Sequence, residues 1–220
     1  MIEAHHPVFA LRLIAVALVT MLCLPLTHDP IATAAAQARP QRSLAAAPPG
    51  VDGAGGAAAL FEEASQYVEK RFAEFRRDRV ADNPQQAEKT RQEQRDLALR
   101  HALTLAARGP LKGTDLYYLG MLYHLAAKDE SALGALRRFL AENPEAPAAM
   151  SQDARAVVVV RAVQLNQLDE AARVLADYGR NQPQKLSERY RLESTLAITL
   201  YRGKQYDRAL PHAVEAYAAA

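Results

Sequence analysis

Three histidines beyond residue 100 could bind a metal ion through their side chains: His101, His124 and His212. They fall on three separate predicted helices, and none belongs to an HExxH pattern, which places two histidines on one helix face. The simplest interpretation is three partly exposed helical histidines. We therefore predict no metal site and no cofactor.

Other catalytic patterns are missing as well. No glycine-rich phosphate loop follows a strand, no GxSxG occurs, and the acidic residues are spread over solvated helix faces. The single cysteine, Cys23, lies in an N-terminal apolar run, and removal of that run would leave no thiol nucleophile and no disulfide. The net charge of +2 is close to neutral, so the sequence lacks the strong basic excess that is typical of nucleic-acid binding. The sequence therefore predicts no catalytic residues.

The stretch 113–144 predicts two helices joined by a short turn. Each half carries apolar residues at helical spacing on one face, and Asp129 between them is placed to cap the second helix. Asn143-Pro144 closes the unit, because proline cannot continue a helix and restricts the residue before it. Two helices with facing apolar stripes form an αα-hairpin. The apolar positions are Leu116, Leu119, Gly120 and Tyr123 in the first half, and Ala132, Leu136, Phe139 and Leu140 in the second.

This hairpin resembles the tetratricopeptide repeat (TPR), a helix–turn–helix unit of about 34 residues. With Gly113 as position 1, the family has large apolar residues at positions 4, 7 and 11, small residues at 8 and 20, an apolar residue at 24 and proline at 32. The sequence departs at position 27, where Phe139 replaces the usual alanine. A generic helical bundle is the alternative. The matching residues are Leu116, Leu119, Tyr123, Gly120, Ala132, Leu136 and Pro144.

The pattern recurs twice towards the C-terminus. Ala171 follows Ala132 by 171 − 132 = 39 residues, and Ala209 follows Ala171 by 209 − 171 = 38 residues. The first helix of the second repeat, expected over 153–167, contains four consecutive valines, which favour a strand by propensity. Its flanks are helical and no other segment offers a partner strand, so we predict a helix. In the third repeat, Pro211 should kink the second helix or delay its start.

The sequence thus predicts an all-α fold in which antiparallel hairpins stack as a TPR-like α-solenoid over residues 113–220. Two further helices, expected over 57–80 and 84–108, form an N-terminal hairpin, 57–109, that caps the array. The first half of the second of these helices is almost wholly polar. We expect it to project into solvent or to cover the edge of another element.

Residues 1–38 are typical of a secretory signal peptide, with an apolar run over 13–26 and a small-x-small cleavage site, Ala-Gln-Ala, at 36–38. The alternative is an uncleaved membrane anchor, although the apolar segment is only just long enough to span a bilayer. Residues 39–56 are rich in Ala, Pro and Gly and are predicted to be a disordered, flexible linker. We expect an exported protein, periplasmic or secreted, that meets the membrane only through its N-terminal segment.

The resemblance implies a partner-binding groove. In the tetratricopeptide family the first helices line a concave groove, mainly through positions 2, 5, 9, 12 and 13, and aromatic, methionine and arginine side chains are common interface anchors. For Tyr117-Tyr118 the alternative is that one ring packs between helices while the other faces water. The predicted partner-binding residues are Tyr117, Met121 and His124 in the first repeat, Val160 and Gln164 in the second, and Arg191, Ile198, Tyr201 and Arg202 in the third.

Two functions fit these features. The first is a non-enzymatic interaction or scaffold module that binds a protein or peptide partner. The second is the N-terminal scaffold half of an exported thioredoxin-like thiol-disulfide oxidoreductase, because its layout is similar to the segments that precede such domains in some bacterial envelope proteins. Its C-x-x-C motif would then lie beyond Ala220. No polar capping helix closes the sequence, so we also expect either a longer protein or a homodimer through the last hairpin.

Overall fold

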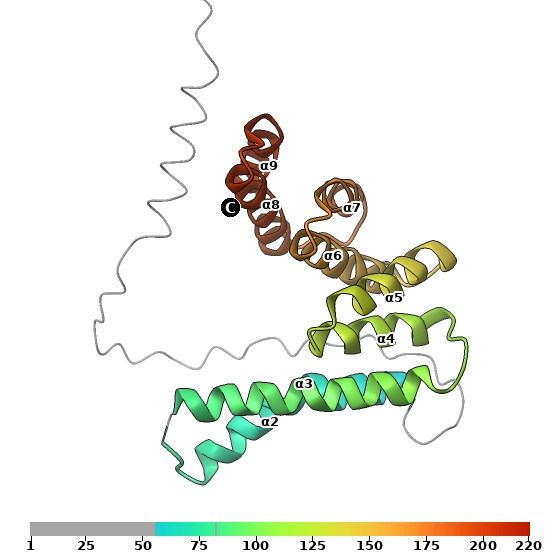
Figure 1. The fold of residues 1–220 in the computed structure, drawn as a ribbon, viewed down its shortest axis with the longest axis vertical. Helices are drawn as coiled ribbons and strands as arrows, with labels where there is room; N and C mark the ends of the chain where they lie inside the picture. Colours follow the sequence, from blue (N-terminus) through green and yellow to red (C-terminus); the bar gives the residue numbers. More distant parts are fainter. Residues whose placement is uncertain (1–55, 82) are drawn as a thin grey trace, which may run out of the picture. The chain divides into compact units, whose positions relative to one another are not determined.

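The structure, a computed structural model, describes residues 56–81 and 83–220. Within these residues every regular element is an α-helix, which confirms the all-α prediction (Figure 1). The predicted signal peptide, 1–38, and all of the predicted linker except Gly56 lie outside the described residues. The helices are α2 (Ala57–Arg77), α3 (Pro84–Ala106), α4 (Gly113–Leu125), α5 (Asp129–Glu142), α6 (Ala148–Gln164), α7 (Leu168–Arg180), α8 (Leu186–Arg202) and α9 (Tyr206–Ala219).

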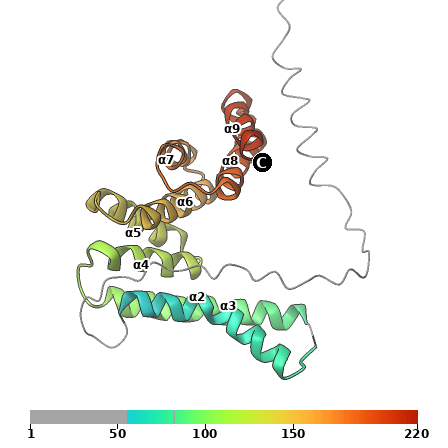
Figure 2. The same ribbon diagram turned by 180° about the vertical axis from the view of Figure 1, so that it is seen from behind.

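These helices form four successive pairs, α2–α3, α4–α5, α6–α7 and α8–α9, whose members pack against each other. Each pair also packs on the next, with α3 on α4, α5 on α6 and α7 on α8. The first members of successive pairs touch as well, α2 with α4, α4 with α6 and α6 with α8. The arrangement is therefore repeat-like, because each pair contacts its neighbours in the same way (Figures 1 and 2).

The last three pairs share one turn geometry. Each turn has three residues, and the middle residue has a positive φ: 54° at Ala127, 57° at Asn166 and 60° at Lys204. The next residue donates its N–H to the carbonyl five residues back, as Lys128 does to Tyr123 over 2.9 Å. This pattern is a Schellman helix end. The same bond joins Gln167 to Ala162 and Gln205 to Leu200.

Small residues occupy the positions where the sequence predicts close helix contacts. Ala132 and Ala171 are 0% exposed and Ala209 is 4% exposed. A Cβ atom on Gly120 would lie 2.5 Å from Cγ of Leu136, which is closer than real Cβ contacts. The absence of a side chain at this position therefore lets α4 approach α5 closely.

The valine-rich helix α6 lies at the centre of the last three pairs. It confirms the helical prediction for the valine run, although it begins at Ala148 rather than at 153. Three of the four valines are buried, because α4, α5, α7 and α8 all pack around this helix. Near its start, buried Gln152 donates its side-chain N–H groups to the carbonyls of Tyr178 and Asn181, at 3.0 and 2.7 Å. This amide ties the start of α6 to the end of α7.

The predicted cap at Asp129 is wrong, and of the two alternative effects predicted for Pro211 the delayed helix start is wrong. Asp129 does not cap α5: Lys128 occupies the N-cap position, no side-chain capping bond is formed there, and Asp129 is the first helical residue. Asp129 instead forms an ion pair with Arg161, at 2.7 Å. Pro211 lies inside α9, which begins at Tyr206, so it does not delay the start of the helix.

The polar first half of α3 lies against α2. The Tyr67 hydroxyl donates to the Glu93 carboxylate at 2.9 Å, and the Gln94 side chain donates to the Ala64 carbonyl at 2.9 Å. These polar contacts join the middle of α2 to the middle of α3. The core accordingly has two parts, one shared by α2, α3 and α4 and a larger one that runs from α4 to α9.

Candidate functional site

The first helices α4, α6 and α8 can be compared residue by residue, because their turns have the same geometry. Met121, Val160 and Ile198 each lie six residues before the left-handed residue of their turn (127 − 121, 166 − 160 and 204 − 198). Since the three helices also touch in chain order, equivalent positions fall on one face of the row. We call this surface the first-helix face. A second equivalent set, three residues before each left-handed residue, is His124, Val163 and Tyr201.

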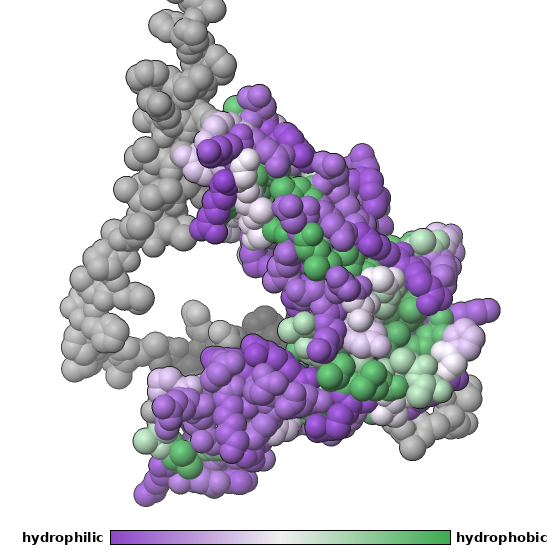
Figure 3. Space-filling view, viewed as in Figure 1, coloured by the Kyte–Doolittle hydropathy of each residue, from purple (hydrophilic) through white to green (hydrophobic). Residues whose placement is uncertain are grey.

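The first set supplies an apolar row on the first-helix face. Met121, Val160 and Ile198 are all half-buried, so each leaves part of an apolar side chain at the surface. Met121 and Val160 also pack against the larger core, which holds them in place. Apolar patches interrupt the polar surface over α4 and over α6 and α8 (Figure 3).

Tyr117, one of the predicted partner-binding residues, lies in the core instead. Its side chain is 6% exposed, and its ring centre lies 5.4 Å from that of Phe139 and 5.2 Å from that of Tyr118. A ring enclosed in this way offers almost no surface to a partner. The structure therefore agrees with the alternative for this pair, in which one tyrosine packs between helices.

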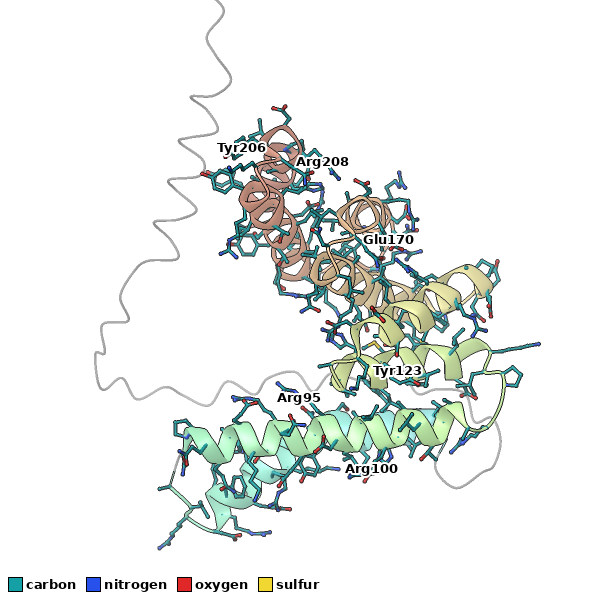
Figure 4. The ribbon with its side chains drawn as sticks, in the orientation of Figure 1. Arg95, Arg100, Tyr123, Glu170, Tyr206 and Arg208 are labelled. Carbon is teal, nitrogen blue, oxygen red and sulfur yellow. The ribbon has the colours of Figure 1, made fainter. Side chains whose placement is uncertain are left out.

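The last pair, α8–α9, presents the exposed aromatic and cationic side chains of the face. Tyr201 is 43% exposed, and its ring centre lies 5.3 Å from that of Tyr206, which is 41% exposed and projects from the α8–α9 pair (Figure 4). Arg191 is exposed and donates to Glu188 at 2.6 Å. Arg202 is exposed at the end of α8. Tyrosine and arginine are the residue types most enriched at protein interfaces.

A polar cluster lies where α4, α5 and α6 meet. Arg161, 9% exposed, donates from Nε to Nδ1 of His124 and from Nη2 to the His124 carbonyl, both over 2.9 Å. Its Nη1 donates to Oε1 of exposed Gln164 at 2.5 Å and lies 2.7 Å from Oδ1 of Asp129. That carboxylate oxygen is close enough for an ion pair but is not aligned as a hydrogen-bond acceptor. The guanidinium thus joins α6 to the start of α5 and to the C-terminal end of α4, where the last carbonyls have no intrahelical donors.

The cluster keeps the His124 ring neutral. Burial, and then the positive charges of Arg161 and Arg191, lower the pKa of His124 from 6.5 to about 4. A neutral ring that accepts a hydrogen bond at Nδ1 carries its proton on Nε2. Burial also lowers the pKa of Arg161, and the Asp129 carboxylate partly offsets this effect.

Arg161 was not predicted to belong to the site, although it binds two residues that were, His124 and Gln164. One signal was present in the sequence: Arg161 is the only charged residue between Ala156 and Gln164 on a helix that is apolar on most faces. A charge in such a setting needs a partner. Two of its partners, His124 and Asp129, lie on or beside other helices, 37 and 161 − 129 = 32 residues away, so their identity could not be inferred.

The second helices present a different surface, on which ion pairs link successive pairs. Arg137 of α5 contacts Glu170 of α7, and Arg208 of α9 contacts Asp169 of α7 at 2.5 Å. Figure 4 labels Glu170 and Arg208 on this row. Exposed ion pairs of this kind contribute little to stability individually. The second helices therefore offer a charged surface, whereas the first-helix face carries the apolar row.

Within residues 56–81 and 83–220, no group of three or more His, Cys, Asp or Glu side chains is placed to hold a metal ion. The remaining helical histidines each meet one carboxylate, His101 with Glu63 at 3.1 Å and His212 with Glu193 at 2.7 Å. None of the helices in the described part of the chain is both long and apolar enough to cross a membrane.

No family model matches this chain, and neither a curated protein nor a solved structure matches it. Its function must therefore be inferred from its own surfaces.

Proposed function

We propose that this chain is an exported helical-repeat interaction module, with the architecture of a TPR-like α-solenoid, that binds a peptide or protein segment across the first-helix face. The recurrence of Met121, Val160 and Ile198 at equivalent positions of touching helices carries the proposal. An extended segment that crosses the row meets a similar apolar side chain on each of the three helices α4, α6 and α8. Repeat proteins use such continuous surfaces for binding.

The ends of the row differ, which gives a bound segment a direction. At the α8 end, Tyr201 and Arg202 supply an exposed ring and an exposed cation. At the α4 end, His124 accepts from Arg161 through Nδ1, so its Nε2–H is the ring donor that can meet a carbonyl of the segment. The module acts by holding its partner and needs no catalytic group.

Site-specific photo-crosslinking in cells tests this proposal. A photo-reactive residue replaces Tyr201 in the full chain, and in a matched variant it replaces Arg173, which is exposed on α7 of the second-helix row. We expect a discrete, saturable product at position 201 that is absent at position 173. The product should be lost when Met121→Asp and Ile198→Asp are added. Equal products at both positions, or a product that survives both aspartates in a chain that stays helical, would place the partner elsewhere.

A further inference from the structure

The outer end of the α2–α3 pair has no counterpart in the other pairs. α2 has 21 residues and α3 has 23, whereas α4, which packs on both, has 13. The outer ends of α2 and α3 therefore extend past α4 (Figures 1 and 2). Neither Phe72 nor Phe75 belongs to the apolar cluster that joins these three helices. We call this end, residues 71–81 and 83–91, the tip.

A surface hollow of about 490 Å³ lies at the tip. This volume falls within the range of ligand pockets, roughly 300–1,000 Å³. Phe72 and Phe75 line it with their ring centres 6.1 Å apart, and Val80 and Ala87 add further apolar surface. Figure 3 shows apolar surface at this end of the pair with polar surface around it. The hollow can therefore take in a large apolar side chain.

Two arginines, Arg76 and Arg91, line the same hollow, and both are exposed. The ion pair of Arg91 with Glu88 is long, 3.4 Å, and both side chains are more than half exposed, so it holds the guanidinium weakly. Residues 71–91 contain six basic and four acidic side chains, an excess of two positive charges. Apolar lining beside two available cations suits an anionic ligand with an apolar group.

We propose that the tip hollow binds an acidic linear peptide segment, which inserts one large apolar side chain against Phe72 and Phe75 and places carboxylates on Arg76 and Arg91. A peptide fits this site better than a membrane surface does, because the hollow is concave and has room for an inserted side chain. The site is separate from the first-helix face and does not depend on what that face binds.

The test measures binding of short fluorescent peptides to the full chain. The first peptide has aspartates on both sides of one phenylalanine, the second has serine in place of the phenylalanine, and the third has lysines in place of the aspartates. Ala87→Phe places a ring in the hollow and obstructs it, and Arg76→Glu with Arg91→Glu reverses its charge. Arg138→Glu with Arg180→Glu makes the same charge change at exposed positions of α5 and α7. We expect only the first peptide to bind, and both tip variants to weaken it at least about tenfold, while the control pair does not.

Several results would overturn the proposal. Undiminished binding to both tip variants places the peptide elsewhere, and equal binding of the serine peptide removes the apolar anchor. Vesicles containing phosphatidylglycerol provide the remaining comparison. If the charge reversal abolishes vesicle binding while the phenylalanine peptide binds no better than its serine control, the tip is a membrane contact instead. Thermal unfolding shows whether each variant is folded. If Ala87→Phe does not fold, peptide binding to the charge-reversed variant decides whether the peptide binds at the tip.

Discussion

The Nε atom of Arg161 lies 2.9 Å from Nδ1 of His124, and the contact requires a neutral ring. A protonated imidazole carries a hydrogen on Nδ1, and a guanidinium has no acceptor to offer it. Two residues predicted to bind a partner, His124 and Gln164, are thus held in place by a side chain that is itself almost entirely buried.

Stability should fall as the pH drops from about 6.5 to about 4. His124 has a pKa of about 4 in the folded chain, against about 6.5 in an unfolded one, so in this window the unfolded state binds a proton that the folded state does not. The free energy of unfolding therefore decreases as the pH falls and stays lowered below pH 4. Urea unfolding at several pH values measures the effect. His124→Gln can still accept a hydrogen bond but does not titrate, so its decrease should be smaller; an equal decrease would contradict the assignment.

Removal of the Arg161 side chain should destabilise the fold strongly. Arg161→Ala leaves the Asp129 carboxylate without its partner and removes one of the two donors to the His124 carbonyl, the other being the Ala127 N–H. The expected loss is about 3 kcal/mol of unfolding free energy. Arg173→Ala is the matched control, because the Arg173 side chain is 66% exposed, and it should change stability by less than about 0.5 kcal/mol. Similar effects for both variants in chemical denaturation would show that the cluster does not hold the helices together.

Two glycine-to-alanine substitutions should change the stability of the fold in opposite directions. Gly120→Ala places a Cβ atom 2.5 Å from Leu136 and should cost about 1–3 kcal/mol through overpacking. Gly134→Ala meets nothing within 4 Å inside α5, so it should stabilise the chain by about 0.5–1 kcal/mol through helix propensity. Thermal unfolding of the two variants compares them directly. A stabilised Gly120→Ala chain would mean that α4 and α5 are not in close contact at this point.

The two tyrosines that the sequence predicts to bind a partner, Tyr117 and Tyr201, should behave differently. Tyr117→Ala removes a buried ring and should cost about 3 kcal/mol of stability. Tyr201→Ala should leave stability within about 0.5 kcal/mol of the original, yet weaken partner binding about thirtyfold if this ring is an interface anchor. Unfolding and binding measured on the same preparations separate the two effects. Unchanged affinity in the Tyr201 variant would remove this ring from the proposed interface.

Export predicts a defined mature N-terminus. Cleavage after Ala38 makes Arg39 the first residue, and N-terminal sequencing of protein from the cell envelope measures it. Ala38→Phe should block cleavage, because the site needs a small residue there. Protein that retains Met1 and stays in the cytosol would exclude export.

The pairing of the helices could be predicted from the sequence, since the spacing of apolar residues and the positions of Gly and Pro are local signals. The shared turn could not, because Ala127, Asn166 and Lys204 have different side chains and only asparagine favours a positive φ. The placement of Tyr117 depended on helix register, in which one residue turns the side chain by about 100°. The cluster around Arg161 needs contacts between helices, which no local pattern specifies.

Each helix in the described residues touches only helices one or two places away along the chain. No contact ties the first pair to the last, so a small rotation between neighbouring pairs disturbs only the joint at which it occurs. Such a chain can bend at the joints between pairs while the two helices of every pair stay packed. The same row of side chains could then follow segments of different curvature while each pair keeps the contacts between its own two helices.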